Sequence, residues 1–424
     1  MKMDKTEYLA YVEQFIKNKE AKQIVSKELT YHIEQEKRRL MQSGKLSEEE
    51  SEQEAVQQMG SPVEVGKHFN QMYRPRTDWW MIALLIISIG FSFLPVLVFD
   101  QEIGNLLVSK YFYTLMGVVM VATLFFFDYR KLQKWGWVFY GAGCVGMYCL
   151  AYGYGPVIHV MGTPIMQAGP LSVRAIYFLP LFILGFSSLF ASPKAKLWKG
   201  LVLVTIPSYF YLNAADFSSL VILLVVFFTM AWYRNLNRKA MLGLIAGGIA
   251  AIAVRLWVAP LHSYQLERFY SFLRPQDYAE SQGYTYLKVQ EMLSETGWFG
   301  HSGNLEDLPS GHTDFVLVSL IYNYGWVVSI LTILVLLSLM ARLVAVNTKI
   351  NDTFGNMLII GGLAFYSFPL LYQVLMSFGL LPFIGISLPF LSYGLHPMVL
   401  HAIVFGLVLS VYRRKDVAGK VPAN

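Results

Sequence analysis

Apolar and polar positions divide the chain into two parts. In residues 1–78, apolar side chains are interspersed among charged ones and recur every three or four positions, as on one helix face. From Trp79 onwards, apolar runs of about 17 to 25 residues follow one another, each long enough to cross a hydrocarbon core of roughly 30 Å. The pattern predicts an all-α, polytopic membrane protein preceded by a small soluble helical domain.

The apolar runs predict about ten transmembrane helices in residues 79–415, followed by a short tail, residues 416–424. Pro207 interrupts one run, but proline is tolerated in membrane helices because neighbouring groups satisfy the freed carbonyl. We expect the spans near residues 79–99, 111–128, 135–153, 175–191, 198–213, 217–233, 240–258, 315–341, 355–378 and 391–412.

The prefix, residues 1–78, carries signals for four helices. Ser47 with Glu50, and Ser61 with Glu64, have the spacing of a capping box at a helix start. Gly60 is expected to end the third helix. The helical repeat of the first two helices comprises Tyr8, Leu9, Val12, Phe15 and Ile16, then Val25, Leu29 and Ile33.

Charge balance argues against a nucleic-acid partner for the prefix, which carries 13 basic and 14 acidic residues. The segments Glu28–His32 and Glu54–Pro62 resemble the HAAS, or permease prefix, domain found ahead of bacterial membrane proteins. That resemblance implies an interaction module, with a cytoplasmic partner bound through residues 1–78.

Composition supports the membrane class and charge predicts the orientation. The chain is 55% apolar and 15% charged, less charge than a soluble domain of this size carries. By the positive-inside rule, both termini are predicted to be cytoplasmic and the long loop, residues 259–314, extracellular. The basic residues on the predicted inner side are Arg130, Lys131, Lys134, Lys194, Lys196, Lys199, Arg234, Arg238, Lys239, Arg342, Lys349, Arg413, Arg414 and Lys415.

The long loop ends at Asp314, whose carboxylate is the candidate catalytic group. Aromatic residues alternate there with Arg268, Arg274 and Lys288, a mixture that suits the membrane–water boundary and an anionic headgroup. Asp314 stands where the loop meets the next span, so we expect partial desolvation to push its pKa towards the range of a general base. The alternative is that Asp314 caps the following helix.

Several motifs, in order along the chain, resemble the SEDS family (shape, elongation, division and sporulation), whose members include RodA, FtsW and SpoVE. The likeness covers residues 79–415 and implies ten spans with a large loop between the seventh and eighth. The matching segments are Ala215–Ser219, Arg268–Pro275, Tyr286 with Gln290, Leu308–Pro309, His312–Phe315, Gly379–Pro382, Gly385, Leu388–Phe390 and Ser392–Gly394.

The resemblance implies a peptidoglycan glycosyltransferase of the bacterial cell membrane. Such proteins polymerise lipid II outside the membrane, paired with a class B penicillin-binding protein, and Asp314 would be the essential carboxylate. A cation would stabilise the departing diphosphate; the candidates are Arg255, Arg268, Arg274 and Lys288, each of which could instead reach lipid headgroups. Further substrate-binding candidates are Arg174, Asp216, Tyr286, Gln290, His312, Thr313, Ser392 and Tyr393.

No metal site is predicted, because the histidines and cysteines lack ligand spacing. We expect no tightly bound cofactor, and only Mg²⁺ or Mn²⁺ carried by the substrate diphosphate.

The chain also departs from the family pattern. Gly169–Ser172 lacks the carboxylate that the family carries there, and Tyr322–Gly325 replaces a pair of glutamates. The family's final Ser-Tyr-Gly-Gly becomes Ser-Tyr-Gly-Leu at 392–395, followed by His396, and its asparagine ahead of the last external loop is matched at best by Gln373. These changes indicate a divergent member.

Two other functions stay open. The lost polar groups favour a lipid II-binding scaffold or regulator of the penicillin-binding protein. A flippase for a lipid-linked precursor is the third, but a translocation path needs ionisable groups at mid-membrane, and this sequence has almost none there. Whether the protein serves elongation, division or sporulation is left open.

Overall fold

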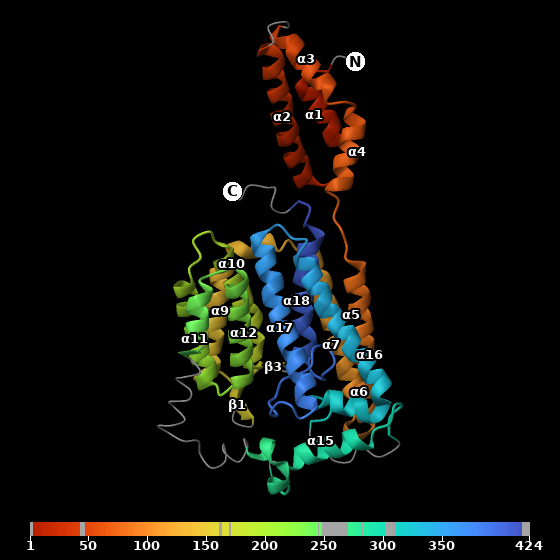
Figure 1. Cartoon of the computed structure of the whole chain (residues 1–424), viewed down its shortest axis with the longest axis vertical. Helices are drawn as coiled ribbons and strands as arrows, with labels where there is room; N and C mark the ends of the chain where they lie inside the picture. Colours follow the sequence, from red (N-terminus) through yellow and green to blue (C-terminus); the bar gives the residue numbers. More distant parts are fainter. Residues whose placement is uncertain are drawn as a thin grey trace. The chain divides into compact units, whose positions relative to one another are not determined.

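A computed structural model describes residues 3–42, 47–160, 163–168, 171–244, 246–247, 270–281, 283–301, 308 and 310–417. The chain forms two compact units: Met1–Thr77 with Tyr412–Asn424, and Asp78–Val411 (Figure 1). We call them the prefix unit and the membrane unit.

Four helices build the prefix unit: α1 (Lys5–Gln14), α2 (Lys19–Gln42), α3 (Glu48–Gln58) and α4 (Pro62–Met72). The helical spacing predicted for the first two is confirmed, because the repeated apolar positions form their inner faces. Val417, from the C-terminal segment, joins this core. The buried members of the repeat are Tyr8, Val12, Ile16, Val25, Leu29 and Ile33.

One of the two predicted capping boxes forms. Ser47 accepts a hydrogen bond from the Glu50 backbone, and the Glu50 carboxylate accepts one from the Ser47 backbone at 2.9 Å. The prediction for Ser61 is wrong, because its side chain makes no capping bond. Pro62 occupies the first turn of α4, where its missing N–H leaves one fewer backbone donor to be satisfied.

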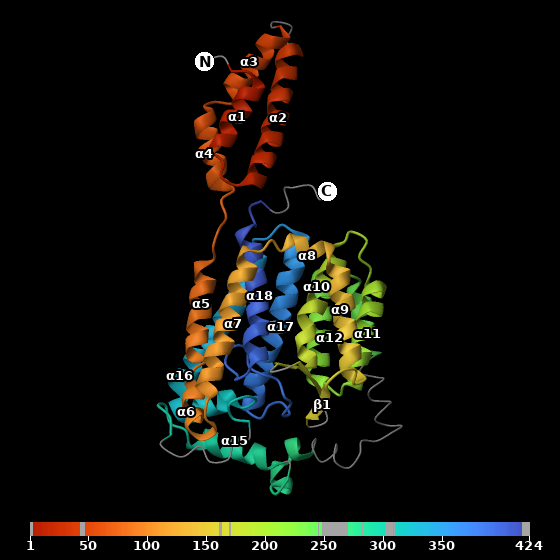
Figure 2. The same ribbon diagram turned by 180° about the vertical axis from the view of Figure 1, so that it is seen from behind.

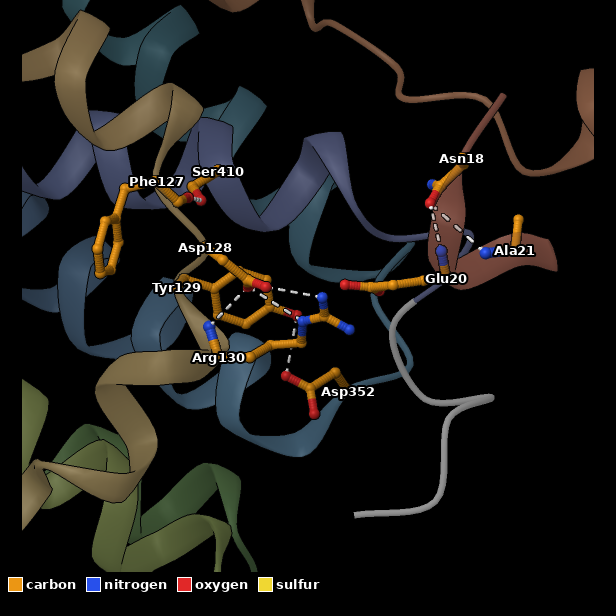
Figure 3. Close-up of polar contacts among 9 residues, drawn as sticks. All are labelled: Asn18, Glu20, Ala21, Phe127, Asp128, Tyr129, Arg130, Asp352 and Ser410. Carbon is orange, nitrogen blue, oxygen red and sulfur yellow. Dashed lines mark hydrogen bonds and ion pairs between the residues drawn. The ribbon is translucent and has the colours of Figure 1, made fainter. Parts of the chain in front are cut away.

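Helix α2 has a cap that the sequence analysis did not predict. The Asn18 side-chain oxygen accepts from the backbone N–H of Glu20 at 3.0 Å and of Ala21 at 3.5 Å (Figure 3). Gly60 ends α3 with a φ of +83°, a left-handed conformation that glycine adopts without steric cost.

The membrane unit is a bundle of apolar helices (Figure 2). Its described helices are α5 (Trp79–Phe91), α6 (Leu94–Ile103), α7 (Leu106–Phe126), α8 (Arg130–Lys134), α9 (Gly136–Ala151), η1 (Ala175–Phe178), α10 (Leu179–Ala191), α11 (Leu197–Asn213), α12 (Phe217–Tyr233), η2 (Pro275–Tyr278), α15 (Tyr284–Glu295), α16 (Val316–Asn347), α17 (Thr353–Ser377) and α18 (Leu395–Arg413).

Among the described residues, five segments are long and apolar enough to cross a membrane: Trp79–Phe99, α7, α16, α17 and α18. Shorter apolar helices are α9, η1 with α10, and α12. The boundary predicted for the second span is displaced, since α7 begins at Leu106 and not near residue 111. Most of the predicted span 240–258 lies outside the described residues.

Close helix packing in the bundle depends on glycine and on one proline. A Cβ atom at Gly136 of α9 would lie 2.3 Å from the Cβ of Ser188 in α10, so only glycine permits this approach. In α11, Pro207 has no N–H to give to the Leu203 carbonyl. The Tyr140 hydroxyl donates to that carbonyl at 2.8 Å and so joins α9 to α11.

Helix α16 is kinked within the segment where the chain departs from the family. Gly325 has a non-helical backbone (φ 80°, ψ 178°). The loop before the site inserts there: the His301 N–H donates to the Tyr322 carbonyl at 2.8 Å, and the Trp326 N–H to the Gly297 carbonyl at 3.4 Å. The replaced residues therefore form a joint between the loop and the helix.

A small antiparallel sheet, β1 (Val157–Val160), β2 (Thr163–Ala168) and β3 (Leu171–Val173), was not predicted. Its register pairs Ile158 with Ile165 and Gln167 with Ser172. The strands lie in the connection between α9 and η1, outside the apolar helices, so hydropathy alone gave no sign of them. Arg174 follows β3 directly, so the sheet sets where this cation lies.

The opposite end of the membrane unit, which we call the basic end, carries α8 and residues 192–199. Here the Tyr129 hydroxyl donates to Asp352 at 3.0 Å, and Arg130 pairs with Asp128 at 2.7 Å (Figure 3). Asp352 also accepts from the Gly355 N–H at 2.7 Å and so caps α17. We call the end with the strands, α15 and the start of α16 the loop face.

Candidate functional site

Asp314 lies on the loop face, at the end of a tight turn before α16. The turn is closed by the N–H groups of Thr313 and Phe315, which donate to the Ser310 carbonyl at 3.0 and 3.2 Å. The helix begins at Val316, with Phe315 at its cap position and no side-chain capping bond. The Asp314 carboxylate therefore does not cap α16, and it has no hydrogen-bond partner among the described residues.

Three hydrogen-bond donors from distant parts of the chain fix the backbone of this turn. The His312 carbonyl accepts a hydrogen bond from the Tyr393 N–H at 2.9 Å. The Thr313 carbonyl accepts one from the Ser392 hydroxyl at 2.8 Å. The backbone carbonyl of Asp314 accepts a hydrogen bond from the Gln373 side-chain amide. We call these three donors the carbonyl clamp. It fixes the backbone and leaves the carboxylate free.

A buried lysine supports the clamp. The Lys110 ammonium in α7 is fully buried and donates to the Phe390 carbonyl at 3.1 Å. Phe390 has a φ of +62°, a strained conformation for a residue with a Cβ. Two residues later comes Ser392, whose hydroxyl also accepts from the Leu388 N–H at 2.8 Å. Lys110 thus anchors the turn that carries two of the clamp donors.

Sequence reasoning missed Lys110. It lies immediately before a predicted apolar run, residues 111–128, and was not among the candidate site residues. Its position could have been a signal, because a charged side chain next to an apolar span is energetically costly to bury, and such residues are often functional.

The Asp314 carboxylate lies against Gly385. A Cβ atom there would stand 3.9 Å from the Asp314 Oδ2 atom, so glycine leaves the carboxylate uncovered on this side. Gly385 also borders a cavity of about 80 Å³, room for a few waters or a phosphate-sized group. Its polar lining comes from Arg174, Asp216, Ser218, Ser219, Ser387, His396 and His401.

Burial raises the pKa of Asp314 above the ordinary range of an aspartate, and the Arg174 guanidinium opposes that rise. A raised pKa makes the carboxylate a better proton acceptor when it is ionised. Burial lowers the pKa of His312, whose ring packs between Phe99 and Tyr393 with 5.7 Å between centroids on either side. The same burial therefore disfavours the charged form of His312.

Two further candidates have structural partners. Asp216 caps α12, accepting from the Ser219 N–H at 3.0 Å and its hydroxyl at 2.8 Å. Tyr286 of α15 stacks on Phe383 at 3.8 Å and accepts from the Phe383 N–H at 3.0 Å. Phe383 in turn packs edge-on against Phe315, beside Asp314. Tyr286 thus joins the loop helix to the site through another aromatic ring.

The remaining candidates lie apart or cannot be placed. Lys288 pairs with Glu291 at 3.0 Å, and this hydrogen bond raises the lysine pKa. Arg274 and Gln290 are exposed on the loop face. Arg255 and Arg268 lie outside the described residues. Of the cations named, Arg174 is the described one whose charge acts on Asp314.

No group of three or more histidine, cysteine, aspartate or glutamate side chains that could hold a metal ion occurs in the described part of the chain.

Comparison with known proteins assigns the family. The sequence profile of the FtsW, RodA and SpoVE cell cycle proteins matches residues 76–416. The chain belongs to this family. It is a multi-pass membrane protein with an all-α fold, so the expected fold class and the SEDS resemblance are confirmed.

Similar proteins in the FtsW/RodA/SpoVE family are named as enzymes. The chain is 27% identical over 219 residues to the probable peptidoglycan glycosyltransferase FtsW of Aliivibrio salmonicida, covering 50% of this chain and 54% of that protein. It is 25% identical over 227 residues to the peptidoglycan glycosyltransferase MrdB of Escherichia coli, covering 52% and 61%. The chain thus spans between half and two thirds of the length of these relatives.

Solved structures show the same fold. A chain of a peptidoglycan synthase complex that coordinates polymerization and crosslinking matches with a TM-score of 0.70 and 21% identity, covering 80% of this chain and 98% of that one. The rod shape determining protein RodA of Thermus thermophilus matches with a TM-score of 0.60 and 19% identity, covering 80% and 97%.

Proposed function

We propose that this family member is a peptidoglycan glycosyltransferase that polymerises lipid II at the outer face of the cytoplasmic membrane. The observation that carries the proposal is Asp314: a desolvated carboxylate with a raised pKa, free of capping bonds, on a backbone fixed by the carbonyl clamp. The names of the relatives agree with this chemistry.

In the proposed reaction, Asp314 accepts the proton of the acceptor sugar's hydroxyl. The freed oxygen forms a bond to the anomeric carbon of the donor, and the bond between that carbon and the diphosphate breaks, the electron pair leaving with the diphosphate. Arg174, on the cavity beside Gly385, would stabilise the developing charge. Mg²⁺ or Mn²⁺ would arrive with the diphosphate and neutralise part of its charge.

The proposal needs the loop face outside the cell. The support is the charge pattern: the basic end carries Lys131, Lys134, Lys194, Lys196 and Lys199, and the positive-inside rule places such an end in the cytoplasm. A cysteine introduced at Gln290, exposed on α15, should react with a membrane-impermeant maleimide added to intact cells. Reaction only after lysis would contradict the orientation.

The partners belong to the same proposal. We infer pairing with a class B penicillin-binding protein, supported by the fold shared with a chain of a complex that coordinates polymerization and crosslinking. We also propose that residues 1–78 bind a cytoplasmic partner, since the prefix unit has its own buried core.

The decisive experiment is polymerisation of purified lipid II by the full chain in proteoliposomes, with and without divalent cation. Wild type should form glycan chains and Asp314→Ala should form none. The matched control is Asp277→Asn, an exposed acid on the same loop face, which should behave as wild type. Polymerisation by Asp314→Ala at the wild-type rate would overturn the proposal.

One observation favours a scaffold as the second candidate. Arg174 is the only described cation among those named that acts on Asp314, and Lys288 is paired with Glu291. A scaffold would bind lipid II and stimulate a partner transpeptidase, while wild type and Asp314→Ala would both fail to polymerise.

A further inference from the structure

A groove at the basic end is lined by α9, α10 and α11 and by the segment joining the last two. It measures about 460 Å³, within the range of pockets that hold a small molecule or a headgroup. Lys194 and Lys199 lie on its rim, and no acidic side chain stands among its described lining residues.

The walls of the groove are rigid. Gly136 and Gly185 let α9 and α10 approach so closely that a Cβ at Gly185 would lie 2.9 Å from the Cβ of Tyr140. The Tyr140 hydroxyl then ties α9 to the Leu203 carbonyl of α11 at 2.8 Å. A ligand would therefore enter a groove that is already formed and would lose little affinity to reordering.

Helix length places this groove at headgroup depth. Helices α9 and α11 contain 16 and 17 residues, fewer than the roughly 20 that span a hydrocarbon core. Their basic ends therefore lie near the boundary of the hydrocarbon. Two tryptophans mark the same level: Trp137 is 65% exposed and Trp198 59% exposed, as is typical of rings in the interface.

We propose that this groove binds an anionic glycerophospholipid. Its phosphate would lie between the Lys194 and Lys199 ammonium groups, and its glycerol against Trp198, over which Lys199 already stands at 5.8 Å from the ring centroid. An acyl chain would follow the apolar wall of Leu189, Val202 and Leu203. Charge complementarity selects the occupant, since two cations without an acid favour a net negative headgroup over a zwitterionic one.

The test is native mass spectrometry of the full chain in detergent, titrated with phosphatidylglycerol or phosphatidylcholine. Wild type should retain phosphatidylglycerol and bind it about thirtyfold more tightly than the double variant Lys194→Gln/Lys199→Gln, from about 1 kcal/mol per lysine. The matched control is Lys131→Gln/Lys134→Gln, which removes two exposed charges from the same end outside the groove and should bind as wild type.

A second variant tests the groove and not its charge. Val202→Trp fills the apolar wall with both lysines intact and should also lose phosphatidylglycerol; Val202 is exposed, so the bundle should keep its melting temperature. Equal losses in the two lysine pairs would show a general surface-charge effect and overturn the proposal. So would equal retention of phosphatidylcholine by wild type, or unchanged binding by Val202→Trp.

Discussion

Two aspartates at the starts of apolar helices have opposite roles. Asp216 stands before α12 and uses its carboxylate to cap that helix through Ser219. Asp314 stands before α16, but Phe315 takes the cap position, and the aspartate makes no capping bond. Both residues lie next to membrane helices, and both stand in segments that resemble motifs of the family.

The two aspartates differ in what holds them, and this difference leaves only one carboxylate free for chemistry. A cap bond fixes an aspartate and satisfies its charge with a backbone N–H, as at Asp216. At Asp314 the fixing is done by the backbone, because the carbonyl clamp holds residues 312–314 and leaves the side chain unbonded. A catalytic base needs both a fixed position and a carboxylate that no other hydrogen-bond donor occupies.

The largest effect should separate the two aspartates in activity. Asp314→Asn keeps the size of the side chain but removes the base, so polymerisation should fall by about 10²- to 10⁴-fold. Asp216→Asn keeps the capping ability and should stay within a few-fold of wild type. Initial rates with purified lipid II in proteoliposomes measure both. Comparable losses of activity in the two variants would contradict the separate roles of the two aspartates.

The next effect concerns the clamp. Removing the Gln373 donor with Gln373→Leu should misplace the Asp314 backbone and reduce kcat by up to about 10²-fold, with KM for lipid II nearly unchanged. Lys110→Met should act in the same direction through Phe390, with a loss of about tenfold.

Rescue distinguishes positioning by Lys110 from a general folding defect. Lys110→Arg keeps a charged donor for the Phe390 carbonyl and should recover most of the activity, while Lys131→Met, at an exposed lysine, should lose none. If Lys110→Met changes KM and kcat together, or if arginine restores nothing, the anchoring role is wrong.

A smaller effect should appear in the pH profile. The base works when ionised, so activity should fall as pH drops through the raised pKa of Asp314. Arg174 lowers that pKa, and Arg174→Gln should therefore move the acidic limb to higher pH. Rates measured across the acidic range test the direction. An unmoved limb would mean that Arg174 does not act on the carboxylate.

The smallest effect should be on stability, with opposite signs. Burial raises the pKa of Asp314 in the folded protein, so its ionisation above that pKa disfavours the native state, and stability is lost as pH rises through it. Asp314→Asn should thus raise the melting temperature at neutral pH. Asp216→Ala should lower stability by about 1 kcal/mol through the lost cap. Thermal unfolding in detergent measures both, and a destabilised Asp314→Asn would contradict the assignment.

Local signals in the sequence predicted much of the architecture. The capping box at Ser47 and the glycine end of α3 formed because both depend on neighbours within a few residues. The Ser61 cap did not form, although its spacing is the same, and the β1–β3 sheet was not predicted because no hydropathy signal marks it.

The membrane class, the family and the candidate acid follow from hydrophobic run length and short motifs, which are properties of consecutive residues. Which acid is free depends on contacts between distant parts of the chain. Two of the clamp donors, Gln373 and Ser392, stand 59 and 79 residues from the carbonyls they bind, and Lys110 stands 280 residues from Phe390. Contacts over such separations depend on how helices pack against each other, which no local pattern of residue types encodes.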